Sequence, residues 1–151
     1  MNIQIKKEKI QEIKIEDQNY PEKLRHIYNP PKKLYVLGNS DLLNKKAIAI
    51  IGCRQYSEYG KKASTYFARE LAKKDITIIS GLAKGIDTYA HQGAISVPQG
   101  KTIAVLGCGL DTIYPAENKE LYREILMNNR NNYNRISNRN KTTKTTFSCK
   151  K

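Results

Sequence analysis

The chain has 151 residues, 39% of them hydrophobic, and a formal net charge of +13. Its length suits a single domain with one core, and its basic charge points first to nucleic acid and second to an anionic membrane surface. No apolar run approaches the core of a signal peptide or the roughly 18 residues of a membrane span. The three cysteines at positions 53, 108 and 149 lie far apart. We therefore expect a cytoplasmic protein without disulfides or membrane contact.

Residues 1–45 are predicted to form an N-terminal extension and linker. The stretch IQIKKEKIQEIKI fits either a short helix or an edge strand, and prolines at positions 21, 30 and 31 interrupt regular structure. The segment KLYVLG (33–38) is apolar enough to lie against a core.

Residues 46–126 alternate between short apolar runs and helical patterns. The expected strands are Ala47–Ile51, Ile76–Ser80 and Thr102–Gly107. The first is continuously apolar, as is typical of a parallel strand buried on both faces. This alternation predicts an α/β, Rossmann-like three-layer fold whose parallel sheet has about three core strands.

Three helices are expected between and after these strands. The apolar face of the first consists of Ala63, Tyr66, Phe67 and Leu71, which are spaced by helical turns. The other two helices are TYAHQGAIS (88–96) and KELYREIL (119–126).

A glycine follows or ends each predicted strand, at Gly52, Gly81 and Gly107. The carboxyl edge of a parallel sheet is where ligands bind, and the helix N-termini there favour anions. Arg54 and Lys84 follow two of these strand ends, where Arg54 could pair bidentately with a phosphate. The pattern favours a phosphate-binding rim, formed by the loops at this edge of the sheet. Alternatively, the glycines only make tight turns, and the two cations are a solvated pair on the surface.

No standard nucleotide fingerprint or catalytic constellation occurs. Gly107–Cys108–Gly109 lacks a third glycine, and no G-x-x-x-x-G-K-[ST] loop is present. Asp87 and His91, one helical turn apart, suit an acid–base pair or half of a metal site, but an ordinary helix-face hydrogen bond is the favoured interpretation. No zinc site is expected without a third ligand. Cys53 and Cys108 are interpreted as small packing residues.

Several ordered motifs resemble those of one family. AIAIIGCRQYSEYG, IISGLAKGIDTYAHQGAI and GKTIAVLGCGLDTIYPAENKELYREI, together with YPEKLRHIYNPPKKLYVLGN before them, resemble the DprA/Smf family of DNA-processing proteins from about Tyr20 to Ile125. That family typically shows a G-[TS]-R loop, an S-G-x-A-x-G-I-D-x-x-A-H segment and a G-x-G-x-D-x-x-Y-P loop. Cys53 replaces the usual Thr or Ser and removes a hydroxyl that could contact phosphate.

The resemblance implies a protein that binds single-stranded DNA, forms a homodimer and helps to load RecA during natural transformation. It implies no enzymatic activity, cofactor or metal. Carried over by position, the residues facing DNA are Gly52, Arg54, Ser80, Gly81, Lys84 and Gly85. The scaffold positions are Asp87, His91, Gly107, Gly109, Tyr114 and Pro115.

Residues 127–151 depart from the family pattern. They carry seven of the thirteen net positive charges, leaving six for the rest of the chain. The family continues with S-E-Y-P-x-G and F-P-x-R-N-R, and codons permitted for Asn129–Lys151, shifted by one base, can encode IGTIITEYPIGTKPQKPHFPARN. We therefore expect a disordered, out-of-frame tail, which would leave a truncated 46–126 domain with an apolar sheet edge and impaired function. The alternative is a basic arm that binds nucleic acid.

Two other functions are compatible with a Rossmann-like fold. A lysine-decarboxylase-like Rossmann phosphoribohydrolase uses similar glycine-rich strand ends, but its P-G-G-x-G-T-x-x-E motif is missing. A small nucleotide-binding module is weakened by the lack of a fingerprint.

Overall fold

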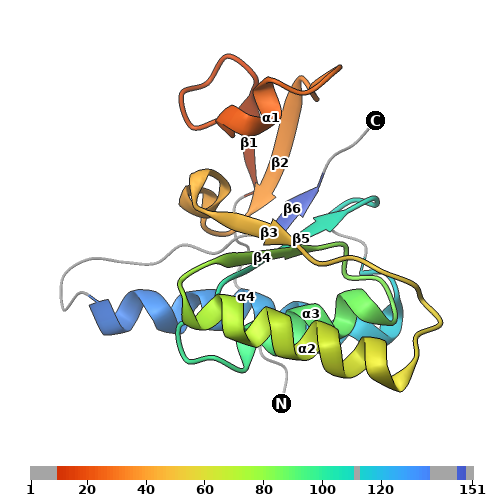
Figure 1. Cartoon of the computed structure of the whole chain (residues 1–151). Helices are drawn as coiled ribbons and strands as arrows, with labels where there is room; N and C mark the ends of the chain where they lie inside the picture. Colours follow the sequence, from red (N-terminus) through yellow and green to blue (C-terminus); the bar gives the residue numbers. More distant parts are fainter. Residues whose placement is uncertain (1–9, 111–112, 137–145, 149–151) are drawn as a thin grey trace.

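A computed structural model describes residues 10–110, 113–136 and 146–148. Six strands form one sheet in the order β1-β2-β6-β5-β4-β3 (Figure 1). The strands are β1 (Gln11–Lys14), β2 (Lys33–Leu37), β3 (Ala47–Ala49), β4 (Thr77–Ser80), β5 (Thr102–Leu106) and β6 (Thr146–Ser148). The α-helices are α1 (Glu22–Arg25), α2 (Glu58–Lys73), α3 (Ile86–Ile95) and α4 (Lys119–Ile136), and the short 3-10 helices are η1 (Ser40–Asn44) and η2 (Ala116–Asn118).

Strands β3, β4 and β5 are parallel neighbours. Their register places Ile48 beside Ile78, and Ile79 beside Ile103. Helices α2, α3 and α4 gather on one face of the sheet (Figure 1). The expected Rossmann-like α/β fold with a three-stranded parallel core is confirmed.

The segment expected to be an extension and linker shares this sheet. β1 pairs with β2 in antiparallel fashion, so residues 11–14 form an edge strand and not a short helix. On the sheet face opposite the helices, Ile13, Tyr20 and Leu34 pack in one buried cluster with Ile103 of β5. Residues 11–45 therefore cover part of the parallel core.

Helix α2 packs through a different face from the one predicted. Its buried residues are Ser64, Ala68 and Ala72, whereas Tyr66 and Phe67 are 53% and 57% exposed. The prediction was wrong for Tyr66 and Phe67, although Leu71 does pack against the buried cluster around Ala68. Small residues form the centre of this face because they permit the close approach of α3. A Cβ added at Gly93 of α3 would lie 2.5 Å from the carbonyl oxygen of Thr65.

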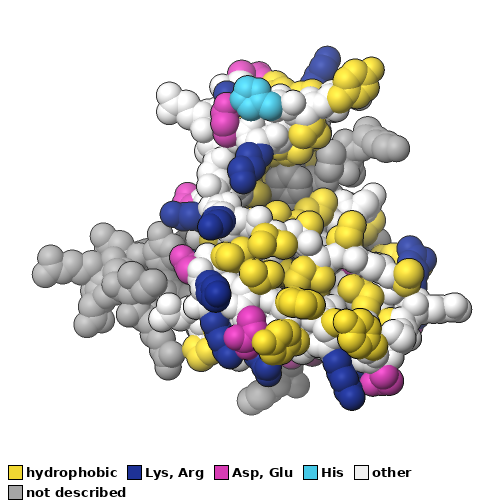
Figure 2. All heavy atoms as spheres, viewed as in Figure 1, with side chains coloured by type: hydrophobic (Ala, Val, Ile, Leu, Met, Phe, Trp, Pro, Cys, Tyr) yellow, Lys and Arg dark blue, Asp and Glu magenta, His cyan; other side chains and the backbone are white. Residues whose placement is uncertain are grey.

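The expectation that the first core strand is buried on both faces was also wrong. β3 lies at the edge of the sheet, where β4 is its only strand neighbour within the described residues. Ile48 and Ile51 are therefore 41% and 73% exposed. Figure 2 shows apolar side chains gathered over the part of the molecule where β3 and α2 lie in Figure 1.

Helix α4 begins where predicted and continues to Ile136. Leu121, Tyr122 and Ile125 are buried in a cluster with Leu106 of β5. Strand β6 lies between β2 and β5, antiparallel to the first and parallel to the second. The predicted disorder of residues 127–151 does not hold for 127–136, which continue α4, or for Thr146–Ser148, which form β6. Residues 137–145 and 149–151 lie outside the described residues. None of the helices in the described part of the chain is long and apolar enough to span a membrane.

Candidate anion-binding site

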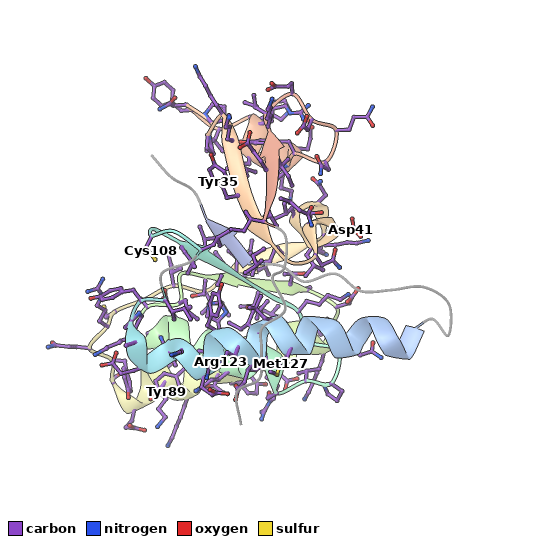
Figure 3. All side chains as sticks on the ribbon, turned by 180° about the vertical axis from the view of Figure 1, so that it is seen from behind. Tyr35, Asp41, Tyr89, Cys108, Arg123 and Met127 are labelled. Atoms are coloured by element: carbon purple, nitrogen blue, oxygen red, sulfur yellow. The ribbon has the colours of Figure 1, made fainter. Side chains whose placement is uncertain are left out.

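A cavity of about 270 Å³ opens at the carboxyl edge of the parallel strands. Its lining residues come from the end of β5 and from the loops after β3, β4 and β5: Arg54, Gly81, Ala83, Lys84, Leu106, Gly107, Cys108, Tyr114 and Pro115. Figure 3 shows the molecule from behind, with Cys108 just beyond the end of β5. The parallel arrangement of the strands brings these loops together.

The carboxylate of Asp87, in the first turn of α3, holds two of the loops in place. It accepts hydrogen bonds from the backbone N–H groups of Gly81 at 3.0 Å, and of Gly52 and Ala83 at 3.4 Å each. Its side chain is buried, and an acidic group is favourable at a helix N-terminus. Asp87 therefore fixes the loops after β3 and β4 against α3.

Asn118 of η2 joins a further loop to the same assembly. Its Nδ2 donates to the carbonyl oxygen of Leu82 and to Oγ1 of Thr88, both at 2.9 Å. Asn118 is buried, so these bonds are shielded from water. The sequence analysis did not identify Asn118. An amide side chain three residues after Pro115, just before a predicted helix, could have indicated it.

The glycines at the rim serve different purposes. Gly85 has a φ of +88°, and a Cβ there would lie 2.3 Å from the carbonyl oxygen of Cys53. At Gly52 a Cβ would lie 2.7 Å from Ile86. Close approach therefore requires glycine at both positions. A Cβ at Gly107 would meet no atom within 4 Å, so this glycine leaves the cavity open without being needed for packing.

Two cations line the cavity, and they differ in how they are engaged. Nζ of Lys84 forms an ion pair with Oε1 of Glu117 at 2.5 Å, and this hydrogen bond lowers the pKa of the Glu117 carboxyl. Arg54 is exposed and has no ion pair within the described residues. Arg54 is thus the cavity cation whose charge is available without displacing another group.

Not every residue predicted to face DNA lies at the cavity. Oγ of Ser80 donates to the carbonyl oxygen of Ile50 at 2.7 Å, and the residue is 2% exposed. Ser80 therefore joins β4 to the end of β3 below the rim. Gly52 and Gly85 shape the loops through their backbones. Gly109, predicted as a scaffold position, is also not among the residues that line the cavity.

The pair of Asp87 and His91 does not form the helix-face hydrogen bond that was favoured. His91 is fully buried, and its Nδ1 lies 2.7 Å from Oγ1 of Thr102. Since that hydroxyl donates to the carbonyl oxygen of Ile78 at 2.8 Å, Nδ1 of His91 is the donor to Thr102. Burial lowers the pKa of His91 to about 3, so the ring is neutral. Its Nε2 is buried with no partner in the described part of the chain.

Other sequence expectations concern metals and cysteines. Within the described residues, no group of three His, Cys, Asp or Glu side chains is placed to hold a metal ion. Cys108 packs against the cluster of α4 and β5, as expected. The packing role expected for Cys53 was wrong, since its side chain is exposed.

A pair of tyrosines lies beside the rim and was also missed. The hydroxyls of Tyr56 and Tyr89 are 2.6 Å apart, and their ring centroids are 4.9 Å apart at an interplanar angle of 75°. Nζ of Lys61 lies 5.2 Å from the centroid of the Tyr89 ring. Figure 3 shows Tyr89 at the same end of the molecule as Cys108. The only indication of this pair in the sequence is the aromatic residue two positions after Arg54.

A parallel sheet whose carboxyl edge carries glycine loops, helix N-termini and cations defines a Rossmann-like anion-binding fold. The chain matches the family model of DNA recombination-mediator protein A over residues 11–148, and it belongs to that family.

The chain is similar in sequence to DprA and Smf proteins. The DNA processing protein DprA of Streptococcus pneumoniae is 44% identical over 114 residues, which cover 76% of this chain and 40% of that protein. Protein Smf of Synechocystis is 40% identical over 114 residues, covering 73% of this chain and 28% of that protein. The chain thus spans well under half the length of these curated relatives.

Solved structures agree with this assignment. The X-ray structure of DprA from Streptococcus pneumoniae matches with a TM-score of 0.74 and 38% identity, covering 93% of this chain and 44% of that one. A structure of DNA processing protein A from Helicobacter pylori, described with its single-stranded DNA binding mode, matches with a TM-score of 0.67 and 33% identity. That match covers 90% of this chain and 57% of the other.

Proposed function

We propose that this chain binds single-stranded DNA through a backbone phosphate placed in the cavity at the carboxyl ends of β3, β4 and β5. The observation that carries the proposal is the exposed guanidinium of Arg54 at a cavity bordered by glycine loops. Arg54 pairs bidentately with the phosphate, as arginine does with planar oxygen pairs. The Helicobacter pylori relative, whose binding mode for single-stranded DNA is described, supports the choice of ligand.

Lys84 acts as a second, conditional contact. In the free protein its ammonium group is paired with Glu117, and both side chains are more than half exposed. An exposed ion pair of this kind contributes little free energy. An incoming phosphate therefore displaces Glu117 at small cost and gains a second positive charge.

The wider activity of the family is also part of the proposal. We propose a binding protein without catalytic activity that acts in DNA uptake during natural transformation, pairs with a second copy and helps to load RecA in the cytoplasm. The DprA relatives support DNA processing as the setting. Residues 127–151 are proposed to be out of frame, which would weaken these activities, and resequencing codons 127–151 tests this directly.

The test of the cavity is a substitution of Arg54. Arg54→Ala is expected to weaken binding to oligonucleotides of any sequence and to reduce the slope of log K against log salt by about 0.7, the loss of one single-strand phosphate contact. Fluorescence anisotropy of a labelled oligothymidylate over a salt series measures both quantities. The melting temperature should stay the same, because the side chain is exposed.

Arg69 of α2 supplies a matched control. Arg69 is also an exposed arginine, although it is paired with Glu70, and it lies about 18 Å along the helix from the N-cap Ser57, at about 1.5 Å per residue. Arg69→Ala should leave affinity and slope close to those of the unmodified chain. If both substitutions weakened binding equally, the protein would attract DNA through its basic surface as a whole. If Arg54→Ala left affinity and salt slope unchanged, the cavity would not be the phosphate-binding site.

A further inference from the structure

The segment after Arg54 carries an aromatic group in a fixed position. Tyr56 is 40% exposed, and its hydroxyl is hydrogen-bonded to that of Tyr89 at 2.6 Å. The two rings meet edge to face at 75°. A ring in a loop would otherwise rotate freely, so the hydrogen bond and the ring contact together restrict its orientation.

Tyr56 also lies close to the cavity. It stands two positions after Arg54, so their Cα atoms are at most about 7 Å apart. The two backbone segments involved are in contact, since the N–H of Ile86 donates to the carbonyl oxygen of Cys53 at 3.3 Å. The loop with Arg54 and Tyr56 is therefore held against the start of α3, which carries Tyr89.

The partner ring, Tyr89, also has a cation beside it, since Nζ of Lys61 lies 5.2 Å from its centroid. The hydrogen bond between the two tyrosine hydroxyls and, to a smaller extent, burial raise the pKa of Tyr89 to about 12. The hydroxyl of Tyr89 therefore stays protonated at neutral pH. Tyr89 is half-buried, which leaves Tyr56 as the more accessible ring.

An exposed aromatic ring next to a phosphate site suits one class of ligand. Single-stranded nucleic acid combines phosphates with bases that stack on aromatic side chains, at about 1–3 kcal/mol for each stacked base. We propose that Tyr56 is a stacking platform for a base whose neighbouring phosphate occupies the cavity, and that Tyr89 is a positioning residue that orients the Tyr56 ring. This inference rests on the proposed function and adds a base contact to its phosphate contact.

The test compares two probes of equal length, an oligothymidylate and an abasic sugar-phosphate chain, with the full 151-residue protein. Tyr56→Ala should weaken thymidylate binding about 5- to 150-fold, the range that corresponds to one stacked base. Its binding to the abasic probe should not change, because no base is present to stack. The salt slope with thymidylate should also stay the same, since no phosphate contact is lost.

The role of Tyr89 is tested by a double-mutant cycle. Tyr56→Phe and Tyr89→Phe each keep a ring and remove the same hydrogen bond. Each should weaken thymidylate binding about 2- to 10-fold, the effect of one hydrogen bond, and the double variant should be no weaker than either single variant. Additive losses would show that Tyr89 does not act through Tyr56.

Tyr66 of α2 is the matched control. It also forms an edge-to-face pair, with Phe67 at 5.6 Å, and has a cation near its ring, the guanidinium of Arg69 at 5.9 Å. Tyr66→Ala should leave binding to both probes unchanged, since Tyr66 lies about 14 Å along α2 from the N-cap Ser57, at about 1.5 Å per residue.

The outcomes separate this inference from the proposed function. If the unmodified chain binds thymidylate and Tyr56→Ala binds it equally well, the stacking role is overturned and the phosphate site stands. Equal losses with the abasic probe also overturn stacking, because they show a disturbed loop. A chain that binds neither probe contradicts the proposed function itself.

Discussion

The cavity rim and the helix–sheet interface below it are made from the same segments, yet their side chains are held in different ways. At the rim, Arg54 and Lys84 are exposed, and Gly107 borders open space. One turn along α3 from Asp87, His91 is buried and bonded to Thr102 of β5. The difference suggests that rim substitutions change binding with little effect on stability, whereas interface substitutions change stability first.

The largest expected effect is loss of stability in acid through His91. Its folded-state pKa of about 3 lies below the ordinary value of 6.5, so the folded protein resists protonation more than the unfolded chain does. Stability from this group is intact above about pH 6.5 and is lost as the pH falls toward 3, by an amount on the order of 4 kcal/mol. Chemical denaturation at a series of pH values measures the loss.

Two substitutions isolate the contribution of His91 from that of the carboxylates. His91→Gln should flatten the pH dependence between pH 6.5 and 3, although it lowers stability at neutral pH. The only other histidine, His26, is exposed and contacts Glu22, so His26→Gln should keep the full dependence. Identical pH profiles for the two variants would show that the buried ring does not control acid stability.

The parallel core could be predicted from the sequence because its apolar strands and glycines follow simple periodic rules. The runs ending at Gly52, Gly81 and Gly107 are adjacent in the sheet, and their exit loops meet at one edge. The packed face of α2 could not be predicted this way. Small residues such as Ser64 and Ala68 carry little hydrophobic signal, and their burial depends on Gly93 in another helix.

The candidate site could also be predicted only in part. The positions of Arg54 and Lys84 at the carboxyl edge of the sheet could be predicted, because a loop lies where the strand before it ends. Three features depend on contacts between distant segments: the ion pair of Lys84 with Glu117, the Tyr56–Tyr89 pair and the bonds of Asn118. Such pairs lie 30 or more residues apart, beyond the reach of periodicity.

A smaller effect, confined to binding, is expected at Gly107. The Cβ that Gly107→Leu adds would meet no atom within 4 Å, so the melting temperature should change little. The added side chain occupies the cavity and should weaken oligonucleotide binding by about tenfold or more, as for a lost contact of roughly 1.4 kcal/mol. Thermal melting and anisotropy titrations of the same samples check both expectations.

Gly85 provides the opposite case on the same edge. Gly85→Ala introduces a Cβ at a φ of +88° and against the Cys53 carbonyl, so the melting temperature should fall. If Gly107→Leu destabilised the protein as much as Gly85→Ala, the division between rim and interface would not hold.

The smallest effect is expected at Glu117, and it is a gain. Glu117→Gln removes the carboxylate that pairs with Lys84 and leaves both cavity cations available to phosphate. Oligonucleotide affinity should rise about two- to fivefold at low ionic strength, and the gain should shrink as salt screens the exposed charges. Glu120→Gln, which frees Arg123 on α4 through the same change in charge, is the control for net charge and should give a smaller gain. In a Lys84→Ala background the two glutamine variants should become equal, because Glu117 then has no lysine to release. If Glu117→Gln instead kept its advantage without Lys84, the carboxylate would act on the phosphate directly, and the ion pair would not restrict access to the cavity.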